Sequence, residues 1–333
     1  MKKVLCFGEL LMRLSPQLQG EWIHQSSMPV YIGGAELNVA AALAKWNIPV
    51  RYCTAIPDHY LSREIIASLE SRKIDTHTIR FSGKRIGLYW LPQGADLKNA
   101  GVLYDRDHSS FSELNPGDIN WDSVLEGIGW FHFSAITPAL NQSVALVCEQ
   151  ALKEAVKRNI FISVDLNYRS KLWQYGKLPT DIMPGLVQYC NCVMGNIWSA
   201  QEMLGIELPN PLQRSRSVML HQAAVTSEAI IQKFPSCSQV ANTFRFDEEN
   251  AIRYYGALYN GNQLFASKEM TVEKIIDRVG TGDCFMAGLI YSMLHENTPQ
   301  ASVEFATAAA CKKFLSKGDF TEATVEEIEN QLK

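Results

Sequence analysis

The residues best suited to catalysis lie in the segment DRVGTGD at positions 277–283, which is followed by the apolar run CFMAGL. Two glycines separated by one residue ahead of a predicted helix let successive backbone N–H groups point outward at the helix N-terminus, where they can bind an anion. A carboxylate at Asp283 could then accept a proton from a substrate hydroxyl while the amides stabilise a transferred phosphoryl group. Taken alone, the spacing favours a simple turn in which Asp283 caps the helix.

A second segment, GGAELNVA at positions 33–40, makes the interpretation more specific. Together the two segments resemble the two signatures of the ribokinase-like (PfkB) carbohydrate kinases. One signature is a glycine pair followed by asparagine and a small-residue helix, and the other is D-T-x-G-A-G-D-x-F-x-A-G. The chain differs from the second signature at Arg278, where the family has threonine, and at Thr281, where it has alanine. The segments lie near opposite ends of the chain in the family's order, so the resemblance covers the whole chain.

The resemblance implies a kinase that uses ATP and Mg²⁺, with Asp283 as the base that deprotonates a sugar hydroxyl. It assigns the anion hole for the phosphate to the backbone amides of Gly280, Thr281 and Gly282. The two glycines, Gly280 and Gly282, also fall on the expected nucleotide side. No residue is assigned as a direct metal ligand.

The resemblance also implies sugar-hydroxyl contacts at Gly33, Gly34 and Asn38. Glycines leave the backbone close to the substrate, and the amide of Asn38 offers both a hydrogen-bond donor and an acceptor. The alternative for Asn38 is the role of a helix cap.

The segment DLNYRSKLW at positions 165–173 bears on which sugar is bound. It directly follows a predicted strand, at the carboxyl edge where open α/β sheets bind ligands. Asp165 and Arg169 belong to this edge, and the fork of an arginine suits a carboxylate or a phosphate. The run N-Y-R-x-K-L-W resembles 2-keto-3-deoxygluconate kinases, although related fructokinases carry a similar N-x-R-x-x-L-W. The alternative for Arg169 is a structural ion pair with Asp165.

A second arginine, Arg106, lies with Tyr104 at the end of a predicted hairpin, and Tyr89 lies on the other strand. In the family, residues of this lid face the sugar. Two arginines in the pocket would favour a sugar acid over ribose, fructose or a nucleoside, because a hydrogen bond to a charged group contributes about 1.5–3 kcal/mol. The alternative for Arg106 is a solvated surface charge.

The nucleotide side departs from the family pattern. The Asn-x-x-Glu motif that helps to organise magnesium appears as NIWS at positions 196–199, and Glu202 is either a partial substitute or a plain helix glutamate. The strand ANTFRFD at positions 241–247 lacks the Gly-x-x-Gly turn. The residues assigned to nucleotide binding from these segments are Asn196, Thr243 and Arg245.

Near the other end of the chain, KGDF at positions 317–320 resembles the stretch that closes the active site in these kinases. Asp319 could contact the substrate, organise a loop for a monovalent ion or lie in a surface turn. The residues alone leave these three roles open.

The elements that must position these residues alternate between short apolar runs and longer segments of helical period. This is the pattern of parallel strands covered on both faces by helices, and it predicts an α/β fold. Strands are predicted at 4–7, 51–55, 131–135, 161–165 and 192–195, and helices at 38–46, 143–157, 182–188 and 301–315. The segment 222–249 shows no clear period. The resemblance implies a ribokinase-like three-layer α/β/α sandwich with a mostly parallel sheet.

Two stretches break this rhythm, at about 10–32 and 85–110. The second alternates apolar and polar residues around Gly94 and Gly101, which predicts hairpin strands. Strands too few to form a core must pack on the body or pair with a second subunit, so we expect a small β-sheet lid on a single domain spanning residues 1–333. The same reasoning favours a homo-oligomer, either a dimer through the lid or a higher oligomer.

Composition excludes several classes of protein. A chain of 333 residues with 47% hydrophobic and 20% charged residues can bury a sizeable core. Its 31 basic and 35 acidic residues give a net charge of -4, which supplies no overall positive field for binding nucleic acid. The longest apolar run, 39–44, cannot span a membrane. Eight scattered cysteines without a CxxC pair predict free thiols in a reducing cytoplasm.

The resemblance therefore implies an ATP-dependent kinase that phosphorylates the terminal hydroxyl of 2-keto-3-deoxygluconate. A fructokinase or another neutral-sugar kinase is one alternative. A degenerate kinase that binds a sugar acid as a sensor is another, because the nucleotide motifs are altered. The intact Gly-Thr-Gly-Asp sequence argues against the sensor, since a protein that only binds has no need of a base.

Overall fold

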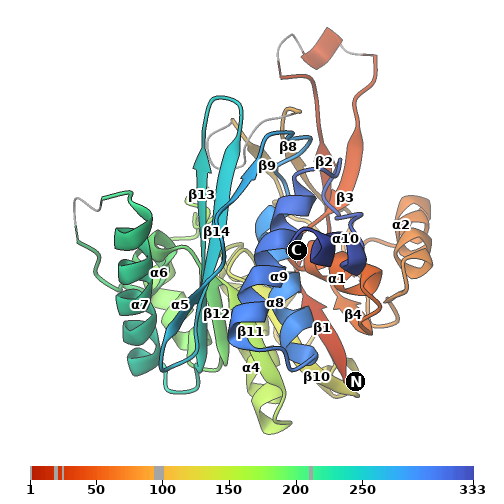
Figure 1. Cartoon of the computed structure of the whole chain (residues 1–333). Helices are drawn as coiled ribbons and strands as arrows, with labels where there is room; N and C mark the ends of the chain where they lie inside the picture. The colour runs from red at the N-terminus through yellow and green to blue at the C-terminus, as the bar shows by residue number, and fades with distance from the viewer. Residues whose placement is uncertain (1, 19–21, 25, 94–100, 210–212) are drawn as a thin grey trace.

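The computed structural model describes residues 2–18, 22–24, 26–93, 101–209 and 213–333, so parts of the predicted lid ranges, including Gly94, lie outside the described residues. A ten-stranded sheet forms the centre, in the order β15-β14-β13-β12-β11-β10-β1-β4-β6 with β16 beside β14 (Figure 1). The pairs from β6 to β13 are parallel and those of β14 are antiparallel. The strands are β1 (Lys3–Phe7), β4 (Val50–Cys53), β6 (Ile74–Asp75), β10 (Ile128–Ser134), β11 (Phe161–Asp165), β12 (Cys192–Gly195), β13 (Gln239–Asp247), β14 (Ile252–Tyr259), β15 (Leu264–Ala266) and β16 (Met270–Val272).

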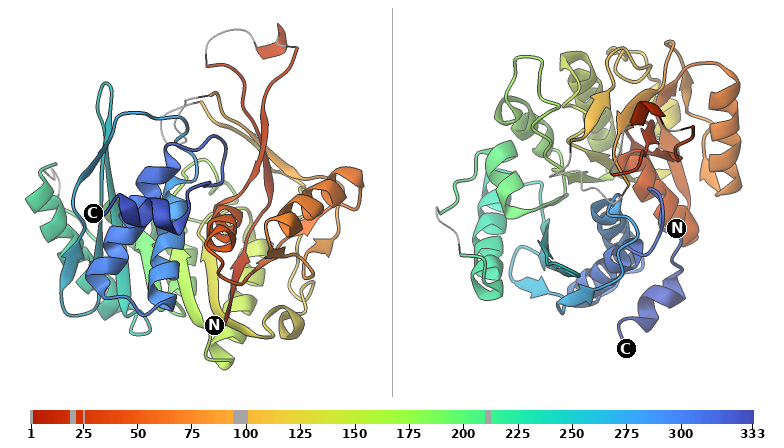
Figure 2. Two further views of the ribbon diagram at one scale, coloured as in Figure 1. Left: turned by 45° about the vertical axis from the view of Figure 1, so that its right-hand side comes forward. Right: turned by 90° about the horizontal axis from the view of Figure 1, so that it is seen from above.

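Helices cover both faces of this sheet (Figure 2). One layer contains α1 (Ala35–Lys45), α2 (Tyr60–Ser71), α8 (Thr281–Leu294), α9 (Pro299–Lys313) and α10 (Val325–Asn330). The other contains α3 (Trp121–Val124), α4 (Gln142–Lys157), α5 (Pro179–Val187), α6 (Ile197–Leu204) and α7 (Arg216–Lys233). Among the described helices, none combines the length and apolar character that crossing a membrane requires.

The central strand β1 shows why its sequence is an unbroken apolar run. Val4 and Cys6 pack in the core of the first helix layer, whereas Leu5 and Phe7 pack in the core of the second. Successive residues of a strand point to opposite faces, so a strand covered on both faces needs apolar residues at every position. The predicted α/β/α fold with a mostly parallel sheet is confirmed.

A separate four-stranded sheet, called the small sheet here, has the order β3-β2-β8-β9. Its strands are β2 (Leu11–Leu14), β3 (Val30–Gly33), β8 (Gly87–Trp90) and β9 (Leu103–Asp105), which lie within the two stretches predicted to form a lid. The short helix η1 (Trp22–His24), which follows β2 and precedes β3 in the chain, projects from the body at the top of Figure 1. A further pair joins β5 (Ala55–Ile56) to β7 (Arg80–Phe81).

Three predicted segments differ in detail from the structure. The helix predicted from Asn38 begins at Ala35, with Gly34 as its N-cap residue. The strand predicted at 51–55 is divided at Thr54 between β4 and β5. The segment 222–249 forms the second half of α7 and the strand β13.

Candidate active site

One pocket of about 450 Å³ lies between the carboxyl ends of the parallel strands and the small sheet. The first turns of α1 and α8 also contribute to it. The predicted site residues that line this pocket are Gly34, Asn38, Tyr89, Tyr104, Arg106, Asp165, Arg169, Asn196, Thr243, Arg245, Gly280, Thr281, Gly282 and Asp283. The fold thus gathers residues from both ends of the chain around one cavity.

Gly33 is the exception among the predicted residues, because it packs behind the pocket. A Cβ atom added to Gly33 would lie 2.3 Å from Oδ2 of Asp319. The glycine is therefore required by the close approach of this carboxylate, and its neighbour Gly34 lines the cavity.

Asp283 and Asn38 both line the pocket and contact each other. Asp283 lies in the first turn of α8 and Asn38 in the first turn of α1, and Nδ2 of Asn38 donates a hydrogen bond to Oδ2 of Asp283 at 2.7 Å. The capping alternatives for both residues are wrong, since the N-cap positions are Gly34 and Gly280. Each helix begins before its polar residue, so Asn38 and Asp283 are helical residues and not caps. Their side chains point toward each other.

The turn before α8 has the geometry expected of an anion site. Gly280 has a φ of 79°, a left-handed conformation that favours glycine, and an added Cβ would lie 2.4 Å from the carbonyl oxygen of Asp319. The N–H groups of the first helical residues have no partner within a helix, and the helix dipole is positive at this end. The amides of Gly280, Thr281 and Gly282 can therefore stabilise negative charge next to Asp283.

The environment of Asp283 raises its pKa to about 8. Burial against protein atoms is the main cause, because it disfavours the charged carboxylate. Repulsion from Asp165 and Glu36 acts in the same direction, while the hydrogen bond from Asn38 and the charge of Arg169 lower the pKa. A carboxyl group with this pKa can accept a proton from a hydroxyl near neutral pH.

The raised pKa predicts that sugar phosphorylation depends on pH. If Asp283 acts as the base, it acts only when deprotonated, so kcat/KM for the sugar should fall about tenfold per pH unit below about 8 and level off above it. Initial rates at low sugar concentration, with ATP and magnesium saturating at every pH, measure this profile. A kcat/KM that stays constant from one pH unit below this pKa to one pH unit above it would contradict the assignment of Asp283 as the base.

A buried carboxylate that sequence reasoning missed holds Arg106 in the pocket wall. Nε of Arg106 donates to Oε2 of Glu9 at 2.6 Å, Nη2 lies 2.5 Å from the same oxygen, and Ser109 donates to Oε1. Arg106 is 5% exposed, so the alternative of a solvated surface charge is wrong. The sequence signal was weak, because a glutamate after the first strand gives no hint of a partner on a hairpin far along the chain.

Another carboxylate missed by sequence reasoning, Glu36, lies on α1 two residues before Asn38. Its Oε1 accepts hydrogen bonds from the backbone N–H and the hydroxyl of Ser134 and from the hydroxyl of Thr137. Burial raises the pKa of Glu36, although these hydrogen bonds oppose the rise. Glu36 lines the pocket and adds negative charge near Asp283.

The loop after β11 brings Arg169 to the pocket. Its Nη1 donates to the carbonyl of the adjacent Tyr168 at 3.1 Å, and Oδ1 of Asp165 accepts the N–H of Asn167 at 3.0 Å. Both Asp165 and Arg169 line the cavity that contains Asp283. An arginine and a carboxylate base therefore face the same space.

The predicted nucleotide residues lie on the wall formed by β13 and the start of α6. Asn196 is the N-cap of α6, and its Oδ1 accepts the N–H of Ser199 at 2.8 Å. Thr243 and Arg245 lie on β13, where Nε of Arg245 is 3.2 Å from a carboxylate oxygen of Asp247. Glu202 on α6 is exposed and also lines the pocket.

Asp319 is 3% exposed, so the alternative of a surface turn is wrong. Its Oδ2 accepts the hydroxyl of Tyr89 at 2.9 Å, and its Oδ1 accepts Nε of Arg13 at 2.8 Å. The hydroxyl of Tyr89 thus donates its hydrogen bond to a protein group, although Tyr89 also lines the pocket. Arg13 is a further residue that the sequence did not single out.

The comparisons with known proteins agree with this geometry. The model of the pfkB family carbohydrate kinases matches residues 1–324. The chain is 33% identical to 2-dehydro-3-deoxygluconokinase of Thermotoga maritima, whose crystal structure matches with a TM-score of 0.90 and 99% of each chain covered. A PfkB family carbohydrate kinase of Listeria grayi is 30% identical, with a TM-score of 0.87 and 99% of each chain covered. The 2-dehydro-3-deoxygalactonokinase of Haloferax volcanii is 24% identical over 99% of this chain and 96% of that protein. With this match over nearly its whole length, the chain belongs to the pfkB family of carbohydrate kinases, which are phosphotransferases with an alcohol group as acceptor.

Proposed function

We propose that the protein transfers the terminal phosphoryl group of ATP to the terminal hydroxyl of 2-keto-3-deoxygluconate. The observation that carries the proposal is the presence of two arginines, Arg106 and Arg169, in the same pocket as Asp283. A sugar acid has a carboxylate for them to bind, whereas fructose and ribose have none. The similarity to 2-dehydro-3-deoxygluconokinase supports the same substrate.

The pocket supplies what the transfer requires at the hydroxyl. Asp283 accepts the proton, and the amides of Gly280, Thr281 and Gly282 face the charge that develops on the transferred group. Asn38 holds Asp283 through Nδ2, and its Oδ1 is buried without a hydrogen-bond partner among the described residues. This acceptor suits a hydroxyl of the sugar, because an unpaired buried polar atom costs free energy until a ligand satisfies it.

The two arginines differ in the charge that they offer. Glu9 already neutralises part of the charge of Arg106, whereas Nη1 of Arg169 donates a hydrogen bond to the neutral carbonyl of Tyr168. We therefore assign the larger share of carboxylate binding to Arg169, with Arg106 acting as an oriented hydrogen-bond donor. Arg106→Ala should accordingly reduce the preference for a sugar acid less than a change at Arg169.

The site fits magnesium that is carried by the nucleotide. Among the described residues, no group of three His, Cys, Asp or Glu side chains is arranged to hold a metal ion. Mg²⁺ is commonly bound by one or two carboxylates together with substrate phosphates, and Glu202 offers one carboxylate on the nucleotide wall. When bound, Mg²⁺ would supply positive charge to the phosphates, and we place ATP along Asn196, Thr243 and Arg245.

A coupled assay with ATP and magnesium tests the proposal. The acceptors are 2-keto-3-deoxygluconate, 2-keto-3-deoxygalactonate, fructose, ribose and adenosine. We expect the highest kcat/KM with 2-keto-3-deoxygluconate. A higher value for fructose would replace the proposal with a fructokinase, and no phosphorylation of any acceptor would overturn it.

We further propose a cytoplasmic homodimer in which the outer face of the small sheet is covered by a second copy. All eight cysteines are buried free thiols, which fits a reducing compartment. Along β2 and β8, Arg13 and Tyr89 are buried whereas the alternating residues Leu14 and Trp90 are less buried. The neighbouring apolar side chains that are exposed include Val30 at 47% and Leu103 at 52%. A sheet face of this kind, left uncovered, is a typical protein interface.

Sedimentation velocity tests the dimer. We expect the wild type to sediment as a dimer and Leu103→Glu as a monomer, because a buried charge without a partner is strongly unfavourable. Leu146→Glu is the matched control, since Leu146 is an exposed leucine on α4, and it should remain dimeric. A monomeric wild type would contradict the proposal.

A further inference from the structure

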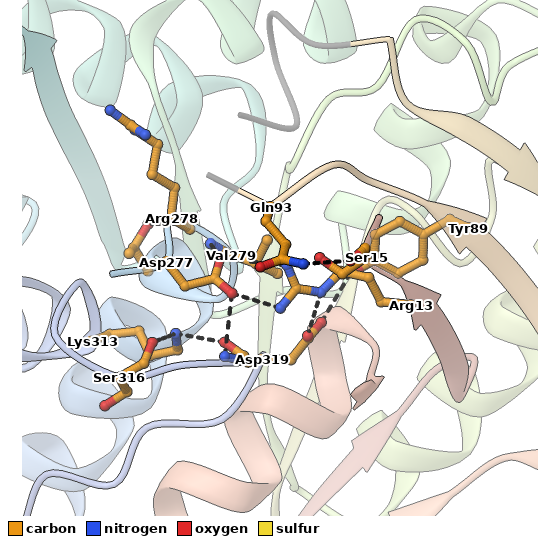
Figure 3. Close-up of polar contacts among 12 residues, drawn as sticks. Arg13, Ser15, Tyr89, Gln93, Asp277, Arg278, Val279, Lys313, Ser316 and Asp319 are labelled. Carbon is orange, nitrogen blue, oxygen red and sulfur yellow. Dashed lines mark hydrogen bonds and ion pairs between the residues drawn. The ribbon is translucent and has the colours of Figure 1, made fainter. Parts of the chain in front are cut away.

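A buried arginine joins the small sheet to the α/β body (Figure 3). Arg13 of β2 is 1% exposed, and its guanidinium group contacts two carboxylates from different loops. Nε donates to Oδ1 of Asp319 at 2.8 Å, and Nη2 donates to Oδ2 of Asp277 at 2.6 Å. The guanidinium carbon also lies 4.4 Å from the ring centre of Tyr31 on β3. The guanidinium group is therefore held by stacking on Tyr31 in the small sheet and by ion pairs with two carboxylates of the body.

Asp277 connects this contact to the anion hole. Its Oδ1 accepts the N–H of Val279 at 3.1 Å, and its Oδ2 accepts the N–H of Gly318 at 3.2 Å. Gly280 follows directly and packs against the carbonyl of Asp319. The turn that presents the amides of residues 280–282 is thus held by the carboxylate that Arg13 binds. Arg278, between Asp277 and Val279, points away from this cluster in Figure 3.

Asp319 and Lys313 complete the cluster on its other side. Asp319 accepts the hydroxyl of Tyr89, so two strands of the small sheet, β2 and β8, donate to one carboxylate. Nζ of Lys313 donates to the carbonyls of Ser316 at 3.2 Å and Gly318 at 2.9 Å. Burial lowers the pKa of Lys313, whereas the charges of Asp277 and Asp319 raise it, so Lys313 is a second basic group near the two carboxylates that Arg13 binds. Loss of one charge would leave another without compensation, which is strongly destabilising in a protein interior.

We propose that Arg13 is a positioning residue, which couples the docking of the small sheet over the sugar to the alignment of the anion-hole amides. Arg13 does not line the pocket, so it acts through Asp277 and Asp319. The side chain of Arg13 then aligns the sugar, which is bound beneath the small sheet, with the phosphate, which is bound at the N-terminus of α8. The proposal rests on phosphoryl transfer in this pocket and holds for whichever sugar is accepted.

The conservative variant Arg13→Lys separates positioning from charge. Lysine keeps the positive charge but lacks the planar fork that spans two carboxylates. We expect kcat to fall roughly ten- to hundredfold, because small misplacements of catalytic groups have effects of this size, and KM for the sugar to rise. The melting temperature should change less than in Arg13→Met. Arg63→Lys is the matched control, because Arg63 forms an exposed ion pair with Asp58, and it should keep the wild-type kcat.

A charge-balanced double variant separates positioning from stability. Arg13→Met with Asp319→Asn removes one cation and one anion and leaves Lys313 to balance Asp277. This protein should fold, and its turnover per folded molecule should remain low because no guanidinium group joins β2 of the small sheet to the two loops. A wild-type kcat in the double variant or in Arg13→Lys would overturn the proposal.

Hydrogen exchange gives a second readout that needs no substrate. Peptides that cover residues 278–282 should exchange faster in Arg13→Lys than in the wild type, whereas peptides from α4 should keep their rates. Unchanged exchange in 278–282 would overturn the proposal. If no sugar is phosphorylated, the proposed function fails and the exchange result still decides on the coupling. If another sugar is preferred, the kcat comparison is made with that sugar.

Discussion

Asp283→Asn should leave the fold intact and remove nearly all phosphoryl transfer. Asparagine has the same shape and can still accept the hydrogen bond from Nδ2 of Asn38, but it cannot take a proton from the sugar hydroxyl. Loss of a general base commonly reduces the rate by about 10²–10⁴-fold. Steady-state kcat with ATP, magnesium and sugar all saturating measures this effect, and isothermal titration of the sugar should show affinity close to that of the wild type.

The matched control for this variant is Asp58→Asn. Asp58 is an exposed aspartate that pairs with Arg63, and neither residue lines the pocket, so its replacement should leave kcat unchanged. Turnover of Asp283→Asn within a few-fold of the wild type would show that another group takes the proton. Loss of sugar binding in the variant would instead mean that Asp283 acts in binding.

Arg169→Lys should lower the preference for the sugar acid without a comparable loss for a neutral sugar. Lysine keeps one positive charge but loses the paired N–H groups that match a carboxylate. The hydrogen bonds at stake contribute about 1.5–3 kcal/mol, so the ratio of kcat/KM for 2-keto-3-deoxygluconate over fructose should fall roughly ten- to hundredfold. This ratio isolates the difference in transition-state binding between the two sugars.

Arg106→Ala provides the internal comparison, because Arg106 lines the same pocket but is paired with Glu9. It should shift the ratio in the same direction and by a smaller factor. An unchanged ratio in both variants would show that neither arginine binds the carboxylate. A wild-type ratio below one would favour fructose as the substrate.

The fold was predictable where local pattern and tertiary environment coincide. The apolar run of β1 predicted a strand because both faces of that strand are covered. The helix α7 was not predicted, because its buried face includes Gln222, Thr226 and Ser227. These polar groups are satisfied inside the protein, where Gln222 donates to Thr226 and Asn242 donates to Ser227. A buried face built partly from hydrogen-bonded polar residues shows no apolar stripe in the sequence.

The candidate site was predictable where it depends on residues adjacent in sequence. The turn 277–283 and the segment 33–40 each hold several functional groups within one local motif, so spacing alone indicates them. Glu9 and Arg13 were missed because each is a single charged residue next to a short apolar run. Their partners, Arg106 and Asp277, lie 97 and 264 residues further along the chain, so no local sequence pattern indicates the pairing. Only the paired strands and the loop packing bring such residues together.

The contact between Arg13 and Asp319 joins residues 306 positions apart, which has a consequence for how the enzyme becomes active during synthesis. Domains dominated by distant contacts fold slowly, and a chain emerging from the ribosome must wait for both partners. A chain that stops before Asp319 would already contain Asp283, the proposed anion-hole residues 280–282 and both pocket arginines. It would nevertheless present Arg13 with only one of its two carboxylates and leave Gly280 without the backbone against which it packs. If Arg13 positions the site as proposed, we expect phosphoryl transfer only from chains that extend beyond Asp319.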